Sequence, residues 1–257
     1  MSSPVTDRER AYYDSYYETE GPAHFAKPAV VAFREYLVKR IVAATGAGPA
    51  TRVLSIGCGI GDTELLLAGR VAQVTGVDLS PQAVAHAQRS AVQHGVSNTE
   101  FLASPWETVS FSDGPFDLVI AVFFLHHLTD QELAAFPARL LPLLRDGGKF
   151  YALEPSIQRL SGRVGRLLIP HLMKKYQTED ERQLARDVTG GYFQSAGFDV
   201  VTNWFDFLST PLAGLFPSWT TGYRLARILD GPLTRCPGLR RVSSNFDFVA
   251  ARPARNS

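Results

Sequence analysis

The sequence predicts an α/β fold in which a mostly parallel sheet is covered by helices on both faces. From about residue 50 onward, short apolar runs alternate with helical patterns, as they do in strand–helix–strand units. The first apolar run, residues 52–56, leads directly into a glycine-rich turn at residues 57–61, and the next run ends at Asp78. A glycine turn after one strand and an acid after the next is how such a fold builds a pocket for a nucleoside.

The strands and the helix that begins near residue 81 are predicted from short sequence patterns. Ser80 before Pro81 predicts a helix start, because serine caps the first turn and proline fits its first position. This helix should continue to about His94 and stop at Gly95. We expect the strands at residues 52–56, 73–77, 99–103, 116–122, 148–154, 198–206 and 245–252.

A further helix is predicted after the fourth strand. Thr129 and Glu132 have the spacing of a capping box, in which each side chain bonds the backbone N–H of the other residue. We expect this helix to end before residues 146–148, where Asp-Gly-Gly precedes the fifth strand.

The glycine turn separates two classes of ligand. Glycines at 57, 59 and 61 let the backbone turn tightly and approach a ligand closely. A dinucleotide fingerprint needs a further glycine at position 62, where the pyrophosphate meets the helix, but Asp62 stands there and would repel it. The spacing therefore favours a nucleoside without phosphates over a nicotinamide dinucleotide, although the fold alone leaves a dehydrogenase open.

Gly57-Cys58-Gly59-Ile60-Gly61 followed by an acid resembles motif I of the class I S-adenosylmethionine (SAM) dependent methyltransferases. Residues 116–121 and 147–154 extend the resemblance, and residues 190–252 follow it more loosely. It implies a Rossmann-like sheet of seven strands in the order 3-2-1-4-5-7-6, with strand 7 antiparallel. It also implies SAM as the cofactor and a small molecule as the acceptor.

The resemblance also implies which residues contact the cofactor. The loop after the first strand would lie against the methionine part, and Asp78 would accept hydrogen bonds from the ribose hydroxyls. Two positions depart from the family pattern, since Ser55 and Ser104 stand where relatives often have an acid. The expected cofactor-binding residues are Tyr13, Tyr17, Gly57, Cys58, Gly59, Gly61, Asp78, Leu79, Ser104, Pro105, Trp106, Ala121, Phe123 and His126.

His126 and His127 are the candidates for catalysis. Methyl transfer from a sulfonium is an in-line displacement, so the protein aligns the reactants and controls the proton of the acceptor. A histidine can take that proton from a hydroxyl at neutral pH, and these two follow a central strand. We expect one of the pair to act as general base; which one, and whether the acceptor atom is oxygen, nitrogen or carbon, stays open. No metal site is expected.

The chain should form a single methyltransferase domain with additions to its core. Residues 1–48 would form an N-terminal helical cap, 49–155 the SAM-binding core, 156–195 lid helices and 196–257 the last strands with an insertion at 208–241. Tyr13 and Tyr17 in the cap would share one helical face and close over the cofactor.

The two additions after the core suggest the nature of the acceptor. A basic amphipathic helix is predicted from Ile157 through Leu168, which leaves contact with a membrane surface open. The insertion at 208–241 is rich in aromatic residues and prolines, and it could be a wall of the substrate site or a contact in a homo-oligomer. This composition favours an apolar or aromatic acceptor, methylated at oxygen or carbon.

Composition limits the partners and the cellular location that we expect for the protein. A net charge of +1 gives no reason to expect nucleic acid as a partner, and no apolar run approaches the roughly 18 residues of a membrane span. Two cysteines and no apolar leader favour the cytoplasm. The alternatives to a small-molecule methyltransferase are an RNA or protein methyltransferase, and a pseudoenzyme or scaffold that has lost part of the pocket.

Overall fold

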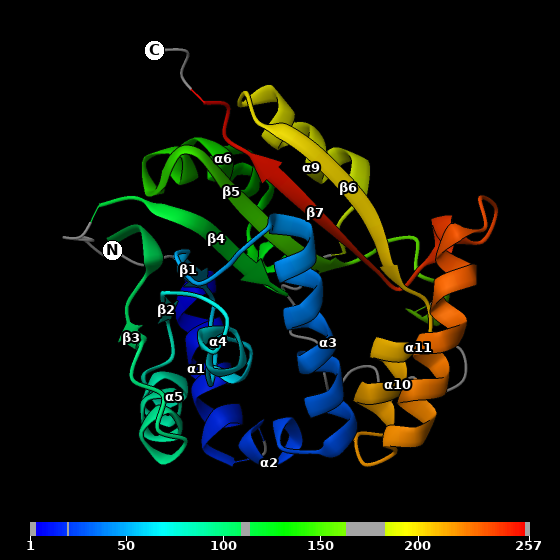
Figure 1. Ribbon diagram of the computed structural model, residues 1–257, viewed down its shortest axis with the longest axis horizontal. Helices are drawn as coiled ribbons and strands as arrows, with labels where there is room; N and C mark the ends of the chain where they lie inside the picture. The colour runs from blue at the N-terminus through cyan, green and yellow to red at the C-terminus, as the bar shows by residue number, and fades with distance from the viewer. Residues whose placement is uncertain (1–3, 20, 109–113, 163–182, 255–257) are drawn as a thin grey trace.

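A seven-stranded sheet forms the centre of the molecule (Figure 1). The computed structural model describes residues 4–19, 21–108, 114–162 and 183–254. The strands are β1 (Arg52–Ile56), β2 (Gln73–Asp78), β3 (Thr99–Ala103), β4 (Phe116–Val122), β5 (Leu144–Pro155), β6 (Asp199–Asp206) and β7 (Asn245–Ala251). Their order is β3-β2-β1-β4-β5-β7-β6, and β7 runs antiparallel to both of its neighbours. The predicted order and the antiparallel last strand are therefore confirmed.

Helices cover both faces of the sheet. They are α1 (Pro4–Thr19), α2 (Gly21–Phe25), α3 (Pro28–Thr45), α4 (Asp62–Ala68), α5 (Pro81–Gln93), α6 (Asp130–Leu140), α9 (Arg186–Ser195), α10 (Ser209–Leu215) and α11 (Thr220–Arg235). Both predicted caps are present. The Ser80 hydroxyl accepts a hydrogen bond from the Ala83 N–H at 3.1 Å, and Thr129 and Glu132 form the complete capping box.

The start of β5 differs from the prediction. Helix α6 ends at Leu140, a short 3₁₀ turn follows, and β5 begins at Leu144 instead of residue 148. Leu144 pairs with Phe116, whereas Lys149 pairs with Leu118, so the register shifts between these pairs. Gly147 lies inside this irregular stretch with a φ of 72°. The glycines thus allow an irregularity within the strand and do not mark its beginning.

Alternate side chains of the central strands bury on opposite faces of the sheet, as the two-residue period of a strand requires. Leu118 and Ile120 of β4 pack into a core with α3, α4, α10 and α11. Val119 and Ala121, between and after them, pack into a second core with α6 and α9. Helix α5 packs over the β2–β3 edge in a smaller cluster around Phe101. Helices on both faces explain why the central strands are continuously apolar.

An ion pair between a half-buried arginine and a buried aspartate joins the N-terminal and C-terminal parts of the chain. Arg40 of α3 donates two hydrogen bonds to the Asp247 carboxylate of β7, at 2.7 and 2.9 Å. The Tyr151 hydroxyl of β5 donates a third at 3.1 Å. Asp247 is fully buried, so these donors satisfy a charge that would otherwise be costly inside the fold.

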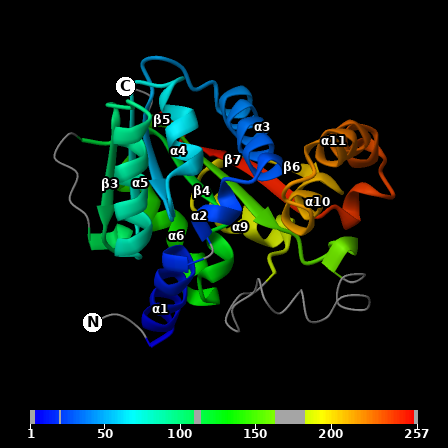
Figure 2. The same ribbon diagram turned by 90° about the horizontal axis from the view of Figure 1, so that it is seen from below.

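The two additions after the core are partly described. The predicted basic amphipathic helix from Ile157 through Leu168 is described only as far as residue 162. Residues 157–158 form a turn and helical structure begins at Leu160, so the predicted start at Ile157 is wrong, and residues 163–168 lie outside the described residues. The insertion between β6 and β7 forms α10 and α11, which pack beside α3 at one end of the sheet (Figure 2). Among the described residues, no helix is long and apolar enough to cross a membrane.

Candidate active site

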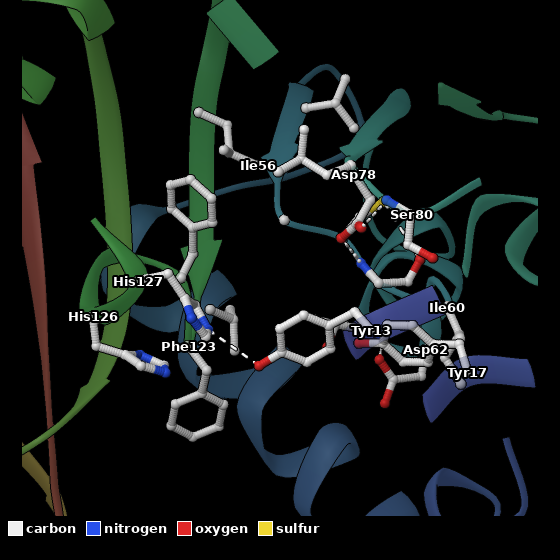
Figure 3. Close-up of a pocket in the computed structure, with 18 of the residues that line it drawn as sticks. Tyr13, Tyr17, Ile56, Ile60, Asp62, Asp78, Ser80, Phe123, His126 and His127 are labelled. Carbon is white, nitrogen blue, oxygen red and sulfur yellow. Dashed lines mark hydrogen bonds between the residues drawn. The ribbon is translucent and has the colours of Figure 1, made fainter. Parts of the chain in front are cut away.

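A large cavity lies at the carboxyl ends of β1, β2 and β4 (Figure 3). Its volume is about 860 Å³, and α1 contributes Tyr12, Tyr13, Tyr16 and Tyr17 to its wall. The structure brings most of the predicted site residues to this cavity: Tyr13, Tyr17, Gly57, Cys58, Gly59, Asp78, Leu79, Ser104, Pro105, Trp106, Phe123, His126 and His127 all line it.

The glycine turn forms a close-fitting floor. Gly57 and Gly59 have φ values of 70° and 52°, which lie in the left-handed region that favours glycine. A Cβ on Gly57 would come within 2.7 Å of the Phe124 ring, and one on Gly59 within 2.8 Å of the Tyr17 hydroxyl oxygen. Any larger residue at either position would therefore collide with the walls of the cavity.

Two predicted cofactor residues do not line the cavity. Gly61 caps α4 with a φ of 76°, and a Cβ there would meet Ala87 and Phe101 at 2.9 Å. Ala121 is fully buried in the core beneath β4. Gly61 is therefore required by the packing of α4 against α5, and Ala121 by the core, so the geometry does not support a ligand contact for either.

Asp78 ends β2 and directs its carboxylate across the glycine turn. One oxygen accepts the Gly59 N–H at 2.8 Å and the other accepts the Ser80 N–H at 2.9 Å (Figure 3). Burial raises the pKa of Asp78 above its ordinary value, and the two N–H donors oppose that rise. Each carboxylate oxygen has two lone pairs, so Asp78 can still accept hydrogen bonds from a diol in the cavity.

Helix α1 is fastened over this side of the cavity. Asp14 accepts a hydrogen bond from the Ser80 hydroxyl at 2.5 Å, which ties α1 to the start of α5. Tyr13 and Tyr17 stack with ring centroids 5.9 Å apart, as their shared helical face predicts. Burial, followed by the nearby Asp78 charge, raises the pKa of Tyr17 well above its ordinary value. Tyr17 is therefore a neutral hydrogen-bonding group at the cavity wall.

The segment after β3 forms another wall. The half-buried Ser104 hydroxyl lies 3.0 Å from the Thr108 hydroxyl and 3.3 Å from the Pro105 carbonyl oxygen. Trp106 is buried and packs on Phe136 of α6 with ring centroids 5.1 Å apart. Ser104 and Pro105 thus face the cavity from a segment that Trp106 anchors in the core.

The turn after β4 is held by a buried carboxylate that the sequence did not indicate. Phe123 has a φ of 55°, a strained conformation for a bulky residue. Glu154, fully buried at the end of β5, accepts the N–H groups of Phe124 at 3.0 Å and Leu125 at 2.7 Å. Its other oxygen lies 2.8 Å from Nδ1 of His126. The turn and the histidine are therefore fixed by one side chain.

This contact favours one tautomer of His126. Because a carboxylate without a proton can only accept a hydrogen bond, it favours the tautomer with the hydrogen on Nδ1 and the lone pair on Nε2. His127 has a different environment, because its Nε2 lies 3.4 Å from the Tyr13 hydroxyl (Figure 3). The two rings are 4.1 Å apart between centroids. Both histidines line the cavity, and the Glu154 carboxylate orients His126.

Glu64 is a second residue that sequence reasoning missed, and it lines the cavity. It lies in the first turn of α4, is 3% exposed, and accepts a hydrogen bond from the Ser55 hydroxyl at 2.6 Å. Burial raises the pKa of Glu64 to about 7, and the neighbouring Asp62 adds to the rise. Arg34 forms an ion pair with Asp62 at 2.7 Å. Glu154 could have been found from its place at the end of a predicted strand, and Glu64 from the missing acid at Ser55.

Comparison with known proteins agrees with this geometry. Residues 53–148 match the family model described as a methyltransferase domain. An uncharacterized methyltransferase of Synechocystis is 29% identical over 153 residues, which cover 60% of this chain and 69% of that protein. The 2-methyl-6-phytyl-1,4-hydroquinone methyltransferase of Synechocystis is 36% identical over 101 residues, or 39% of this chain and 30% of that protein. Other curated relatives are matched over about half of their length, 47%.

Solved structures show the same fold over the whole chain. The magnesium protoporphyrin IX methyltransferase of Synechocystis, solved with bound S-adenosylhomocysteine (SAH), superimposes with a TM-score of 0.65 at 17% identity. The alignment covers 96% of this chain and 99% of that one. Among the described residues, no cluster of histidines, cysteines and acids is arranged to hold a metal ion.

Proposed function

We propose that the protein is a class I SAM-dependent methyltransferase that methylates a small apolar or aromatic molecule at oxygen or carbon, since residues 53–148 match the model of a methyltransferase domain. One observation carries the proposal: a glycine-floored pocket with Asp78 at one side continues into an aromatic-walled space beside His126. A volume of about 860 Å³ is near the upper end of the range of small-molecule sites. It offers room for an acceptor beside the cofactor.

The residues present suit SAM. Gly57 and Gly59 leave space that a Cβ would fill, Asp78 can accept from ribose hydroxyls, and the wall is rich in carboxylates and tyrosines. Such a wall suits a positively charged ligand without phosphates. When bound, SAM would supply an activated methyl group on a sulfonium.

The chain's own contribution is alignment and control of one proton. We assign the general base to His126, whose Nε2 would accept the proton of an acceptor hydroxyl. Glu154 would hold the ring in the tautomer that has its lone pair on Nε2 and would stabilise the imidazolium that forms. Tyr13 and Tyr17 would exclude water from the cofactor side, since α1 covers the cavity there.

The acceptor class rests on the remaining walls. Phe25, Phe33 and Phe123 line the cavity, and α10 adds Ala213 and Gly214. These surfaces suit a flat apolar molecule better than a highly charged one. Two relatives in the comparisons are named for hydroquinone and porphyrin substrates, which supports a ring-shaped acceptor. The free thiols of Cys58 and Cys236 support a reducing, cytoplasmic location.

Radiolabelled methyl transfer tests the proposal. Purified protein and methyl-labelled SAM are incubated with a panel of phenols, hydroquinones, fatty acids, amines, a peptide mixture and total RNA, and labelled products are identified by mass spectrometry. We expect label only in apolar or aromatic small molecules. Transfer only to RNA, peptide or charged acceptors would refute this acceptor class, and SAM binding without any transfer would favour a pseudoenzyme.

A further inference from the structure

The Glu64 carboxylate lines the cavity and has no part in the proton transfer proposed above. It is buried, and its Oε1 accepts a hydrogen bond from the Ser55 hydroxyl at 2.6 Å. The other oxygen, Oε2, is buried with no hydrogen-bond partner among the described residues. An unsatisfied carboxylate oxygen inside a protein is costly, so its presence at a ligand cavity indicates a donor that comes with the ligand.

The surroundings of Glu64 narrow the kind of donor. Arg34, whose charge acts on Glu64, already pairs with Asp62 at 2.7 Å and donates to the Thr63 hydroxyl at 3.3 Å. The Asp62 charge raises the pKa of Glu64 more than the Arg34 charge lowers it, so the net effect of these two charges is that of a negative charge. A positively charged donor would remove both the unsatisfied oxygen and the repulsion. A neutral hydroxyl would satisfy the oxygen but would leave the repulsion between the carboxylates unchanged.

The position of Glu64 matches one part of the cofactor. Asp78, beyond the glycine turn, suits the two ribose hydroxyls. Glu64 lies beside the end of β1 instead, where Ser55 occupies the position at which motif I often has an acid. The carboxylate missing from β1 is thus supplied from α4, with its Oε1 held against Ser55.

We propose that Oε2 of Glu64 binds the α-ammonium group of the methionine part of SAM and of its product SAH. This inference rests on SAM being the cofactor. Ser55 is then a positioning residue, because its hydroxyl fixes the orientation of the Glu64 carboxylate. Ser55 and Glu64 together thus take the place of the acid that motif I often has at the end of the first strand.

A pair of ligands separates this role from a structural one. SAH carries the ammonium group, whereas 5′-methylthioadenosine keeps the adenosine and lacks the amino-acid part. Isothermal titration of both ligands against wild-type protein, Glu64→Gln and the surface control Glu100→Gln gives the comparison. We expect Glu64→Gln to weaken SAH by about 10- to 100-fold, the range of a hydrogen bond to a charged group. Affinity for methylthioadenosine should change less than about twofold, as should both affinities of the control.

A double variant tests whether a carboxylate on β1 can replace the carboxylate of Glu64. Ser55→Asp combined with Glu64→Ala returns the carboxylate to β1, and it should bind SAH at least about tenfold more tightly than Glu64→Ala alone. If Glu64→Gln weakens both ligands alike, or neither, the inference is overturned while the cofactor assignment stands. If the wild-type protein binds neither ligand, the cofactor assignment itself fails, and the inference fails with it.

Discussion

At the scale of single residues, the site combines groups whose protonation depends on burial. The protonation of Glu64 should affect the free energy of unfolding, because the pKa of Glu64 is about 7 in the folded chain and has an ordinary value of 4.5. Between these values the folded state holds the proton more tightly. The contribution of Glu64 to the free energy of unfolding is therefore fully present below about pH 4.5 and is lost as the pH rises through 7.

Glu64→Gln should remove this pH dependence. Compared with the variant, the wild-type protein should lose about 3 kcal/mol of unfolding free energy between pH 4.5 and pH 8, since one pKa unit is equivalent to about 1.4 kcal/mol. Urea denaturation of both proteins at several pH values measures the difference. An equal change in the two proteins would show that position 64 does not titrate in this interval.

Glu154 offers a second test at this scale. In Glu154→Gln the amide can present an N–H to Nδ1 of His126, which moves the ring proton to Nε2 and removes the lone pair there. We expect kcat to fall by about 100-fold or more, while the dissociation constant of SAH stays within about twofold. Nitrogen NMR of the histidine tautomer provides a readout that does not depend on turnover. An unchanged tautomer with unchanged kcat would remove Glu154 from the proposed mechanism.

At the scale of elements, local chemistry sets where the helices begin. The capping box at Thr129 satisfies the first turn of α6, whose Leu133 and Phe136 pack into the core next to Trp106. Thr129→Ala should lower the free energy of unfolding by about 1 kcal/mol, whereas Thr129→Ser should retain most of it. Urea midpoints of the two variants decide the point, and equal midpoints would mean that the box contributes little.

The sequence could predict features that depend on neighbouring residues, but not those that depend on residues far apart in the chain. Both helix caps were predicted because their signals are local: Ser80 directly precedes Pro81, and Thr129 is three positions before Glu132. The strand order followed from the resemblance of the glycine turn to one family. The early start of β5 was not predicted, since it depends on Leu144 pairing with Phe116. Glu64 and Glu154 were missed for the same reason: their partners Ser55 and His126 are 9 and 28 positions away. Only the folded chain brings them together.

At the scale of the whole molecule, Arg40 and Asp247 join segments that are 207 residues apart. Removing the guanidinium in Arg40→Ala leaves the Asp247 carboxylate buried with the Tyr151 hydroxyl as its remaining side-chain donor. We expect a loss of about 2–3 kcal/mol in the free energy of unfolding, below the full value for a buried pair because the Arg40 side chain is 29% exposed. Adding Asp247→Asn should recover part of this loss, and calorimetry can measure all three proteins. A double variant less stable than Arg40→Ala would contradict this account.

The place of β7 between β5 and β6 has a consequence for synthesis on the ribosome. Both outer strands leave the exit tunnel before the strand that will join them, so the nascent chain cannot complete its sheet while residues 245–251 are still to be made. Until then the backbone edge of β5 is open to pairing with other chains. The sheet is therefore completed only after residues 245–251 have left the tunnel, and this interval is when chaperone binding would protect the protein from aggregation.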